Sequence, residues 1–156
     1  MPSVSPFNHG NILRKFNVGI IGYGWAATAH IDAINASGMA QVTHVYSSRL
    51  LDDDELSVRY GSRIKTTTNL NSVLKNPRVD VVDVTSYPYQ HADQVVAAAK
   101  AGKHVFCEKP MAMKQADARR MAAAASSLST RGFPSTCPTS AAGEPSPARR
   151  RISKQR

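Results

Sequence analysis

The chain has 156 residues, a formal net charge of +9 and two cysteines. This length allows one domain with a hydrophobic core and excludes two full domains. The sequence shows no apolar stretch long enough for a membrane span or a signal peptide, and two cysteines exclude a disulfide framework. It therefore predicts a cytoplasmic protein with no membrane partner.

Segments typical of strands and helices alternate between residues 14 and 128, after a polar leader over residues 1–13 that is expected to be disordered. The expected strands cover residues 16–21, 41–46, 64–67, 79–85 and 104–107. The expected helices begin near residue 25, cover residues 50–60, centre on residues 70–74 and 92–99, and end near residue 128. This alternation predicts an α/β fold with one doubly wound parallel sheet of about five strands, a Rossmann fold.

A glycine turn follows the first expected strand and precedes the first expected helix. Gly22 permits a sharp turn, Gly24 removes the Cβ that would keep a pyrophosphate away, and Ala27 lets the helix pack close to its strand. The N–H groups at the start of the helix favour an anion. The pattern predicts a cofactor-binding turn made of Gly22, Tyr23, Gly24, Trp25, Ala26 and Ala27.

The second expected strand ends in Ser47-Ser48-Arg49, and no acidic residue occurs until Asp52. An acid at this point would bind the ribose hydroxyls of NAD, whereas hydroxyls and a guanidinium suit the 2′-phosphate of NADP. Ser47, Ser48 and Arg49 are therefore predicted to bind the cofactor, with NADP slightly favoured. The alternative is that Arg49 is a solvated residue at the start of the next helix.

Other polar residues have simpler explanations than a metal site. The acids at residues 52–55 suit the positive end of a helix dipole. His30 is expected to be a packing or capping residue. No Cys/His spacing resembles a zinc site, so no metal ligands are predicted.

Residues 79–110 read VDVVDVTSYPYQHADQVVAAAKAGKHVFCEKP. This stretch resembles the glucose-fructose oxidoreductase, inositol dehydrogenase and rhizopine-catabolism (Gfo/Idh/MocA) family, through Ala101-Gly102-Lys103-His104-Val105 and Glu108-Lys109-Pro110. His91 falls at the family's histidine position, whereas Ser86-Tyr87 stands where the family often has Thr-Pro. The resemblance covers roughly residues 14–128, the family's cofactor-binding domain.

The resemblance implies hydride transfer between NAD(P) and a sugar or polyol. Lys109 would be the catalytic lysine that polarises the substrate hydroxyl, because an ammonium stabilises a developing alkoxide. The Lys109–Pro110 bond is a candidate for the cis form. The implied cofactor-binding residues of this region are Ser86, Tyr87, His91, Glu108, Lys109 and Pro110.

Residues 129–156 hold six basic residues and one acidic residue, and they are predicted to form a disordered basic tail rich in Ser, Pro and Arg. By this resemblance, we expect the family's sixth strand and second α+β domain to be missing. We therefore expect a truncated or frame-shifted oxidoreductase that is inactive alone, of unknown oligomeric state. The alternative is a non-catalytic NAD(P)-sensing or interaction protein. Nucleic-acid binding through Arg149–Arg151 would be non-specific, so no specific nucleic-acid partner is predicted.

Overall fold

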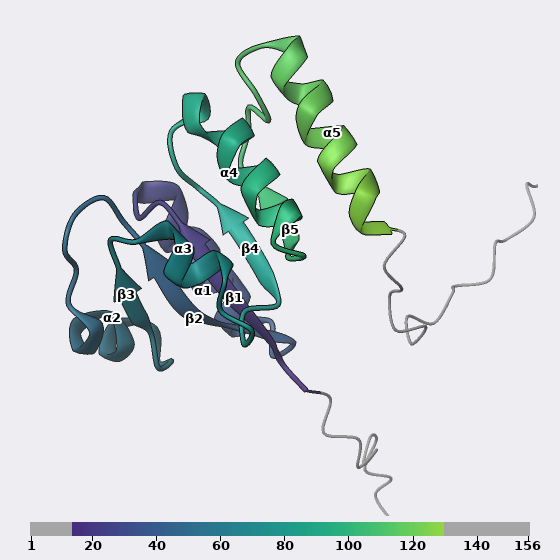
Figure 1. The fold of residues 1–156 in the computed structure, drawn as a ribbon. Coiled ribbons are helices and arrows are strands. Elements are labelled where there is room, and N and C mark those ends of the chain that lie inside the picture. Colours follow the sequence, from purple (N-terminus) through teal and green to yellow (C-terminus); the bar gives the residue numbers. More distant parts are fainter. Residues whose placement is uncertain (1–13, 130–156) are drawn as a thin grey trace, which may run out of the picture.

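The computed structural model describes residues 14–129, so the expected leader and the tail beyond Ser129 lie outside the described residues. Five strands and five helices alternate along this range (Figure 1). The strands are β1 (Phe16–Ile21), β2 (Ala40–Tyr46), β3 (Lys65–Thr67), β4 (Val81–Val84) and β5 (His104–Cys107). The helices are α1 (Trp25–Ala36), α2 (Asp53–Tyr60), α3 (Leu70–Leu74), α4 (Pro88–Lys100) and α5 (Gln115–Ser129).

The strands form one parallel sheet in the order β3-β2-β1-β4-β5. The chain starts in the middle, moves outward through β2 and β3, and returns to the other side of β1 with β4. This order confirms the predicted doubly wound α/β fold. It also creates a switch point between β1 and β4, where such sheets bind their ligands.

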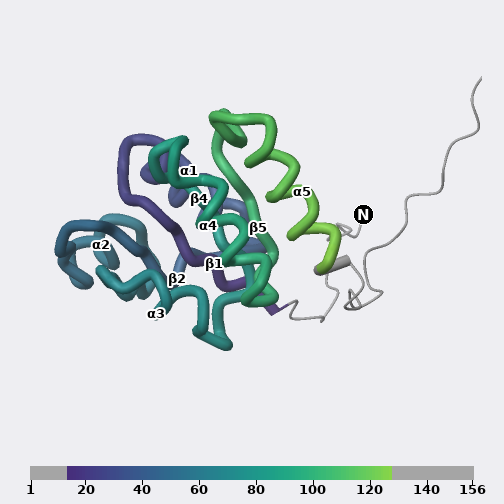
Figure 2. Tube along the Cα trace, turned by 45° about the horizontal axis from the view of Figure 1, so that its top comes forward, coloured from purple at the N-terminus to yellow at the C-terminus, as the bar shows by residue number. Residues whose placement is uncertain are grey.

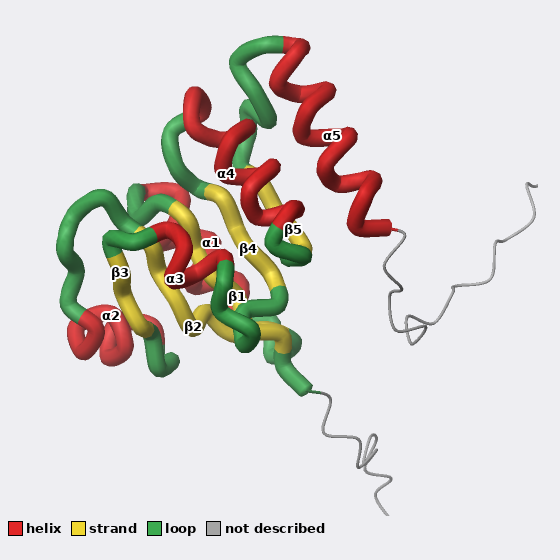
Figure 3. Tube along the Cα trace, in the orientation of Figure 1, coloured by secondary structure: helices red, strands yellow, loops and turns green. Residues whose placement is uncertain are grey.

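Helices cover both faces of the sheet (Figures 2 and 3). Alternate residues of each strand point to opposite faces, so the sheet has two cores. One core lies under α1 and α2, with Val18, Ile20 and Ile31 among its fully or almost fully buried residues. The other lies under α3, α4 and α5, where Ile21 and Val82 are buried.

Several element ends differ from the sequence prediction. β2 begins at Ala40 rather than residue 41, and β3 begins at Lys65 rather than residue 64. α2 begins at Asp53 rather than residue 50, because the Asp52 carboxylate accepts hydrogen bonds from the backbone N–H groups of Asp54 and Glu55 and caps the helix. β4 covers only Val81–Val84 of the expected 79–85. The spans of β1 and β5 agree with the prediction.

The α1 face of the sheet is less well covered over β4 and β5. A groove of about 570 Å³ lies there between α1 and these strands, and the apolar side chains of Phe16, Met39 and Phe106 remain exposed along it. Within residues 14–129, no helix is both long enough and apolar enough to cross a membrane.

Candidate functional site

A cavity of about 640 Å³ opens at the carboxyl ends of β1, β2 and β4, at the switch point of the sheet. Three segments line it: the turn between β1 and α1, the residues after β2, and the residues between β4 and α4. The lining residues are Gly22, Tyr23, Gly24, Trp25, Ala26, Tyr46, Ser47, Ser48, Arg49, Thr85, Ser86, Tyr87, Tyr89 and Gln90. The predicted glycine turn and the predicted Ser-Ser-Arg segment therefore face one another across a single cavity.

The two glycines of the turn have different physical roles. Gly22 has a φ of +98°, and a Cβ added there would lie 2.6 Å from the Cα of Ser86, so this position requires glycine for the fold itself. Gly24 has an extended backbone with a φ of −126°, and a Cβ there would meet nothing within 4 Å. The fold itself therefore does not require glycine at residue 24. A diphosphate that approached the backbone there would require it, because a Cβ would occupy the same space.

The N-terminus of α1 is open toward the cavity. Gly24 is its N-cap, no side chain caps its N–H groups, and its first turn contains no acidic residue. By contrast, Asp52 caps α2, and Asn69 caps α3. An uncapped helix start leaves donors and a positive dipole end for an anion. Trp25, at the first position of α1, is 88% exposed.

The segment after β2 supplies hydroxyl groups and a cation. Ser47 is buried, and its Oγ accepts a hydrogen bond from the Arg49 backbone N–H at 3.2 Å. Ser48 and Arg49 are exposed. No Asp or Glu belongs to the described residues that line the cavity, so its only formal charge is the Arg49 guanidinium.

The segment after β4 closes the cavity on the side of α4. The rings of Tyr87 and Tyr89 stack with their centroids 5.8 Å apart, and both side chains are exposed. Ser86 donates a hydrogen bond from its hydroxyl to Gln94, which fixes the start of α4. Tyr46, Thr85, Tyr89 and Gln90 also line the cavity, although the sequence analysis did not identify them.

Five predicted cofactor-binding residues lie outside the cavity lining: Ala27, His91, Glu108, Lys109 and Pro110. Ala27 is fully buried in the core under α1, where its small side chain allows the predicted close packing. His91 is also fully buried, with Nδ1 3.0 Å from the carbonyl oxygen of Pro110 and Nε2 3.0 Å from that of Ser86. In this structure His91 therefore connects two loops at the rim and does not itself face the cavity.

The Glu108-Lys109-Pro110 turn follows β5, at the same edge of the sheet as the cavity. The Lys109–Pro110 peptide bond is cis, as the sequence suggested. Lys109 is exposed, and its backbone N–H donates to the Glu108 carboxylate at 2.6 Å. The Glu108 backbone N–H donates to the carbonyl oxygen of Val84 at 2.9 Å, which holds this turn against the end of β4.

A histidine–carboxylate cluster beside this turn was not found from the sequence. His30 was expected to pack or cap; its ring does lie near Phe106, with ring centroids 5.7 Å apart, but its nitrogens face Asp83 and Glu108. Asp83 is 1% exposed. Burial raises the pKa of the Asp83 carboxyl, and the hydrogen bond from His30 opposes this. In the sequence, the contact between His30 and Asp83 has one signal: each of the two polar residues interrupts an apolar pattern, His30 in α1 and Asp83 in β4.

Residues 16–134 match the family described as "Oxidoreductase family, NAD-binding Rossmann fold". Myo-inositol 2-dehydrogenase of Thermotoga maritima is 35% identical over 107 residues, which are 67% of this chain and 31% of that protein. Levoglucosan dehydrogenase in complex with NADH and L-sorbose is 30% identical with a TM-score of 0.65, over 72% of this chain and 32% of that one.

A 3-ketoreductase from Actinomadura kijaniata, in complex with NADP and TDP-benzene, is 28% identical with a TM-score of 0.67. The match covers 74% of this chain and 35% of that one. The chain thus spans about a third of the length of the relatives that it matches.

Proposed function

Because the chain belongs to the Gfo/Idh/MocA oxidoreductase family with an NAD-binding Rossmann fold, we propose that its cavity binds NAD(P) and serves hydride transfer to or from a sugar or polyol. The observation that carries this proposal is the pair of glycines. Gly22 is required by the fold, whereas the space at Gly24 lies open at an uncapped helix start. A cofactor pyrophosphate fits such a position, since backbone donors can then reach its oxygens.

The residues of the chain have separate tasks in this function. The turn between β1 and α1 holds the pyrophosphate, and the segment after β2 holds the adenosine ribose. Bound NAD(P) supplies the hydride acceptor or donor. We assign to Lys109 the polarisation of the substrate hydroxyl, because its ammonium is exposed at the same edge of the sheet and stabilises negative charge as it develops on oxygen.

We further propose that NADP is preferred over NAD. Ser47, Ser48 and Arg49 line the cavity, and no carboxylate among its described lining residues is available for the ribose hydroxyls. A 2′-phosphate would gain hydrogen bonds from the hydroxyls and a planar cationic partner. A carboxylate in this position would instead repel that phosphate.

The first test is binding to the wild-type chain and to Gly24→Ala. Trp25 is the only tryptophan and lines the cavity, so its fluorescence reports nucleotide binding directly. We expect saturable quenching by NAD(P) and an affinity at least about 10-fold weaker in Gly24→Ala, because the added Cβ occupies the pyrophosphate position. The variant should lose no more than about 1 kcal/mol of stability, the difference between glycine and alanine at a helix N-cap.

The matched variant is Gly22→Ala. Its Cβ meets the backbone of Ser86 in the empty protein, so we expect a lower unfolding midpoint even without cofactor. Equal nucleotide affinity in the wild type and in folded Gly24→Ala would contradict the proposed binding mode. Absence of quenching by any pyridine nucleotide at millimolar concentration would contradict the proposed function as a whole.

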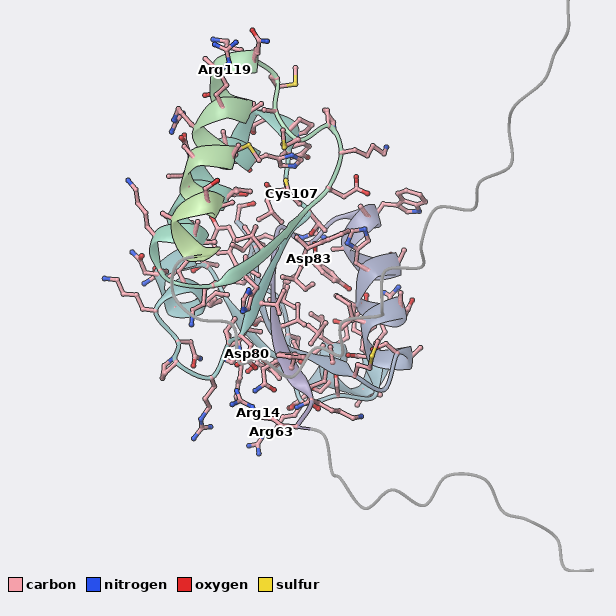
Figure 4. The ribbon with its side chains drawn as sticks, turned by 90° about the vertical axis from the view of Figure 1, so that its right-hand side faces the viewer. Arg14, Arg63, Asp80, Asp83, Cys107 and Arg119 are labelled. Carbon is pink, nitrogen blue, oxygen red and sulfur yellow. The ribbon has the colours of Figure 1, made fainter. Side chains whose placement is uncertain are left out.

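The second test is the cofactor preference of Arg49→Ser. We expect the NADP affinity to fall by about 10-fold or more while the NAD affinity changes little, since only NADP carries the 2′-phosphate. Arg63→Ser is the control, because Arg63 is also exposed but precedes β3 and lies toward the opposite end of the sheet (Figure 4). An equal loss for both nucleotides in Arg49→Ser would show that Arg49 does not discriminate between them.

A further inference from the structure

Three side chains, the His30–Asp83–Glu108 cluster, connect the interior of the sheet to Lys109. His30 belongs to α1, Asp83 to β4, and Glu108 follows β5 directly. Figure 4 shows Asp83 between β5 and α1, below Cys107 at the end of β5. None of the three residues lines the cofactor cavity, so cofactor binding alone gives no reason for the cluster.

The imidazole of His30 lies between the two carboxylates. Its Nδ1 is 2.8 Å from Oδ2 of Asp83, and its Nε2 is 3.6 Å from Oε1 of Glu108. This hydrogen bond fixes the orientation of the ring, and Nδ1 is its donor whenever the Asp83 carboxyl is ionised, because an ionised carboxylate only accepts hydrogen bonds. Asp83 is itself held rigidly, because it belongs to an inner strand and its side chain is 2% exposed.

Glu108 extends this chain of contacts to Lys109. Its Oε2 accepts the backbone N–H of Lys109 at 2.6 Å, while its own backbone N–H donates to Val84. The backbone of residue 108 is thus fixed by the sheet, and its carboxylate accepts the Lys109 N–H with one oxygen while the other oxygen lies 3.6 Å from Nε2 of His30. A change in the carboxylate orientation would release the peptide that carries Lys109.

We propose that His30 is a positioning residue. Asp83 anchors the His30 ring, and the ring orients the Glu108 carboxylate. The carboxylate holds the Lys109 peptide and therefore sets the direction in which the Lys109 side chain points. The inference rests on the proposed function only for the role of Lys109. The contacts themselves can be tested without substrate or cofactor.

The charges of the cluster explain why a histidine suits this place. Oδ1 of Asp83 has no hydrogen-bond partner among the described residues, so the contact of Oδ2 with His30 is the one side-chain hydrogen bond of this buried carboxyl within the described part of the chain. A doubly protonated imidazole donates toward both carboxylates, whereas a neutral ring donates toward one. The Cys107 thiol near the cluster stays neutral at pH 7, because burial and the carboxylates of Asp83 and Glu108 raise its pKa to about 11.

The test is amide hydrogen exchange, measured by NMR on the wild-type chain and on His30→Ala. We expect exchange of the Lys109 amide to become about 10-fold faster or more in His30→Ala, while amides in β1 and β2 change less than about 2-fold. His104→Ala is the control, since His104 is an exposed histidine at the other end of β5. An unchanged Lys109 amide, or equally faster exchange throughout the sheet, would overturn the proposal.

A second measurement covers the case in which His30→Ala does not fold. It compares amide exchange at Lys109 in two variants of Glu108. Glu108→Gln retains an acceptor for the Lys109 N–H, so exchange of the Lys109 amide should change less than about 2-fold, whereas Glu108→Ala removes the acceptor and should speed exchange about 10-fold. Unchanged exchange in Glu108→Ala would overturn the inference, whereas loss of Trp25 quenching by NAD(P) would bear only on the proposed function.

Discussion

At the scale of single residues, Cys107 illustrates how the surroundings of a side chain set its reactivity. It ends β5 and is partly buried, and it is a free thiol. Burial first, and then the nearby carboxylates of Asp83 and Glu108, raise the pKa of the thiol to about 11. Only the thiolate attacks alkylating reagents, so Cys107 is expected to react at least about 10-fold more slowly than an ordinary cysteine at pH 8, even after its higher intrinsic nucleophilicity is counted.

The measurement is iodoacetamide labelling of the Cys137→Ser variant, which leaves Cys107 as the one thiol. The same variant unfolded in urea is the control, because unfolding removes both the burial and the carboxylates. Equal labelling rates in the folded and unfolded protein would show that the surroundings do not suppress the thiolate.

The residues of the cavity could be predicted where the physical requirement is local. A glycine turn between a strand and a helix, and a polar segment after the second strand, both follow from adjacent residues, and the structure places both around one cavity. The His30–Asp83–Glu108 cluster could not be predicted in the same way, because its members come from three elements and meet only through the strand order. Tyr89 was missed because an exposed ring at a helix start gives no sequence signal.

At the scale of secondary-structure elements, Asp53 joins the first turn of α2 to β3. Its Oδ1 accepts from both the hydroxyl and the backbone N–H of Thr66, at 2.7 Å each, and Lys65 lies 3.1 Å from Oδ2. These contacts, the Thr66 hydroxyl foremost, lower the pKa of the Asp53 carboxyl. A lowered pKa means that the folded state favours the ionised form, so this stabilisation is present above the usual Asp range and is lost as the pH falls through the folded-state value.

We therefore expect Asp53→Asn to lower the free energy of unfolding by about 1 kcal/mol at pH 7 and by progressively less as the pH is lowered toward about 3. Urea unfolding at several pH values measures this difference. Asp54→Asn is a matched control, since Asp54 lies in the same turn, is exposed, and its carboxylate accepts no hydrogen bond within the described residues. A loss in Asp53→Asn that does not depend on pH would contradict the assignment.

Element boundaries were predictable to the extent that one residue determines them. β1 and β5 are short apolar runs with clear polar ends, and their spans agree with the structure. The start of α2 was predicted too early, because the apolar residues Leu50 and Leu51 continue the helical pattern, whereas the Asp52 carboxylate fixes the actual start. Capping therefore outweighs hydrophobic periodicity at this end.

At the scale of the whole molecule, the strand order determines where chemistry can occur. β1 and β4 are neighbours, yet their following segments turn to opposite faces of the sheet, with α1 on one side and α4 on the other. The cavity lies where the two segments separate. Lys109 reaches the same edge because β5 runs parallel to β4. The alternation of elements predicted a doubly wound parallel sheet, and the order β3-β2-β1-β4-β5 comes from the structure.

The described part of the chain supplies more of what the proposed cofactor site needs than of what a substrate site needs. Trp25, Tyr87 and Tyr89 are exposed at the cavity, Lys109 is exposed, and none of the described residues that line the cavity is a His, Asp or Glu. Hydride transfer from an alcohol also requires a group that takes the hydroxyl proton.

We therefore expect the 156-residue chain, tested as it stands, to bind NAD(P) and to show no reduction of NAD(P) that depends on an added sugar or polyol. Turnover above background that disappears in Lys109→Met would contradict this expectation, because the lysine and the cofactor site would then suffice for hydride transfer. Binding without turnover agrees equally with a non-catalytic NAD(P)-binding role.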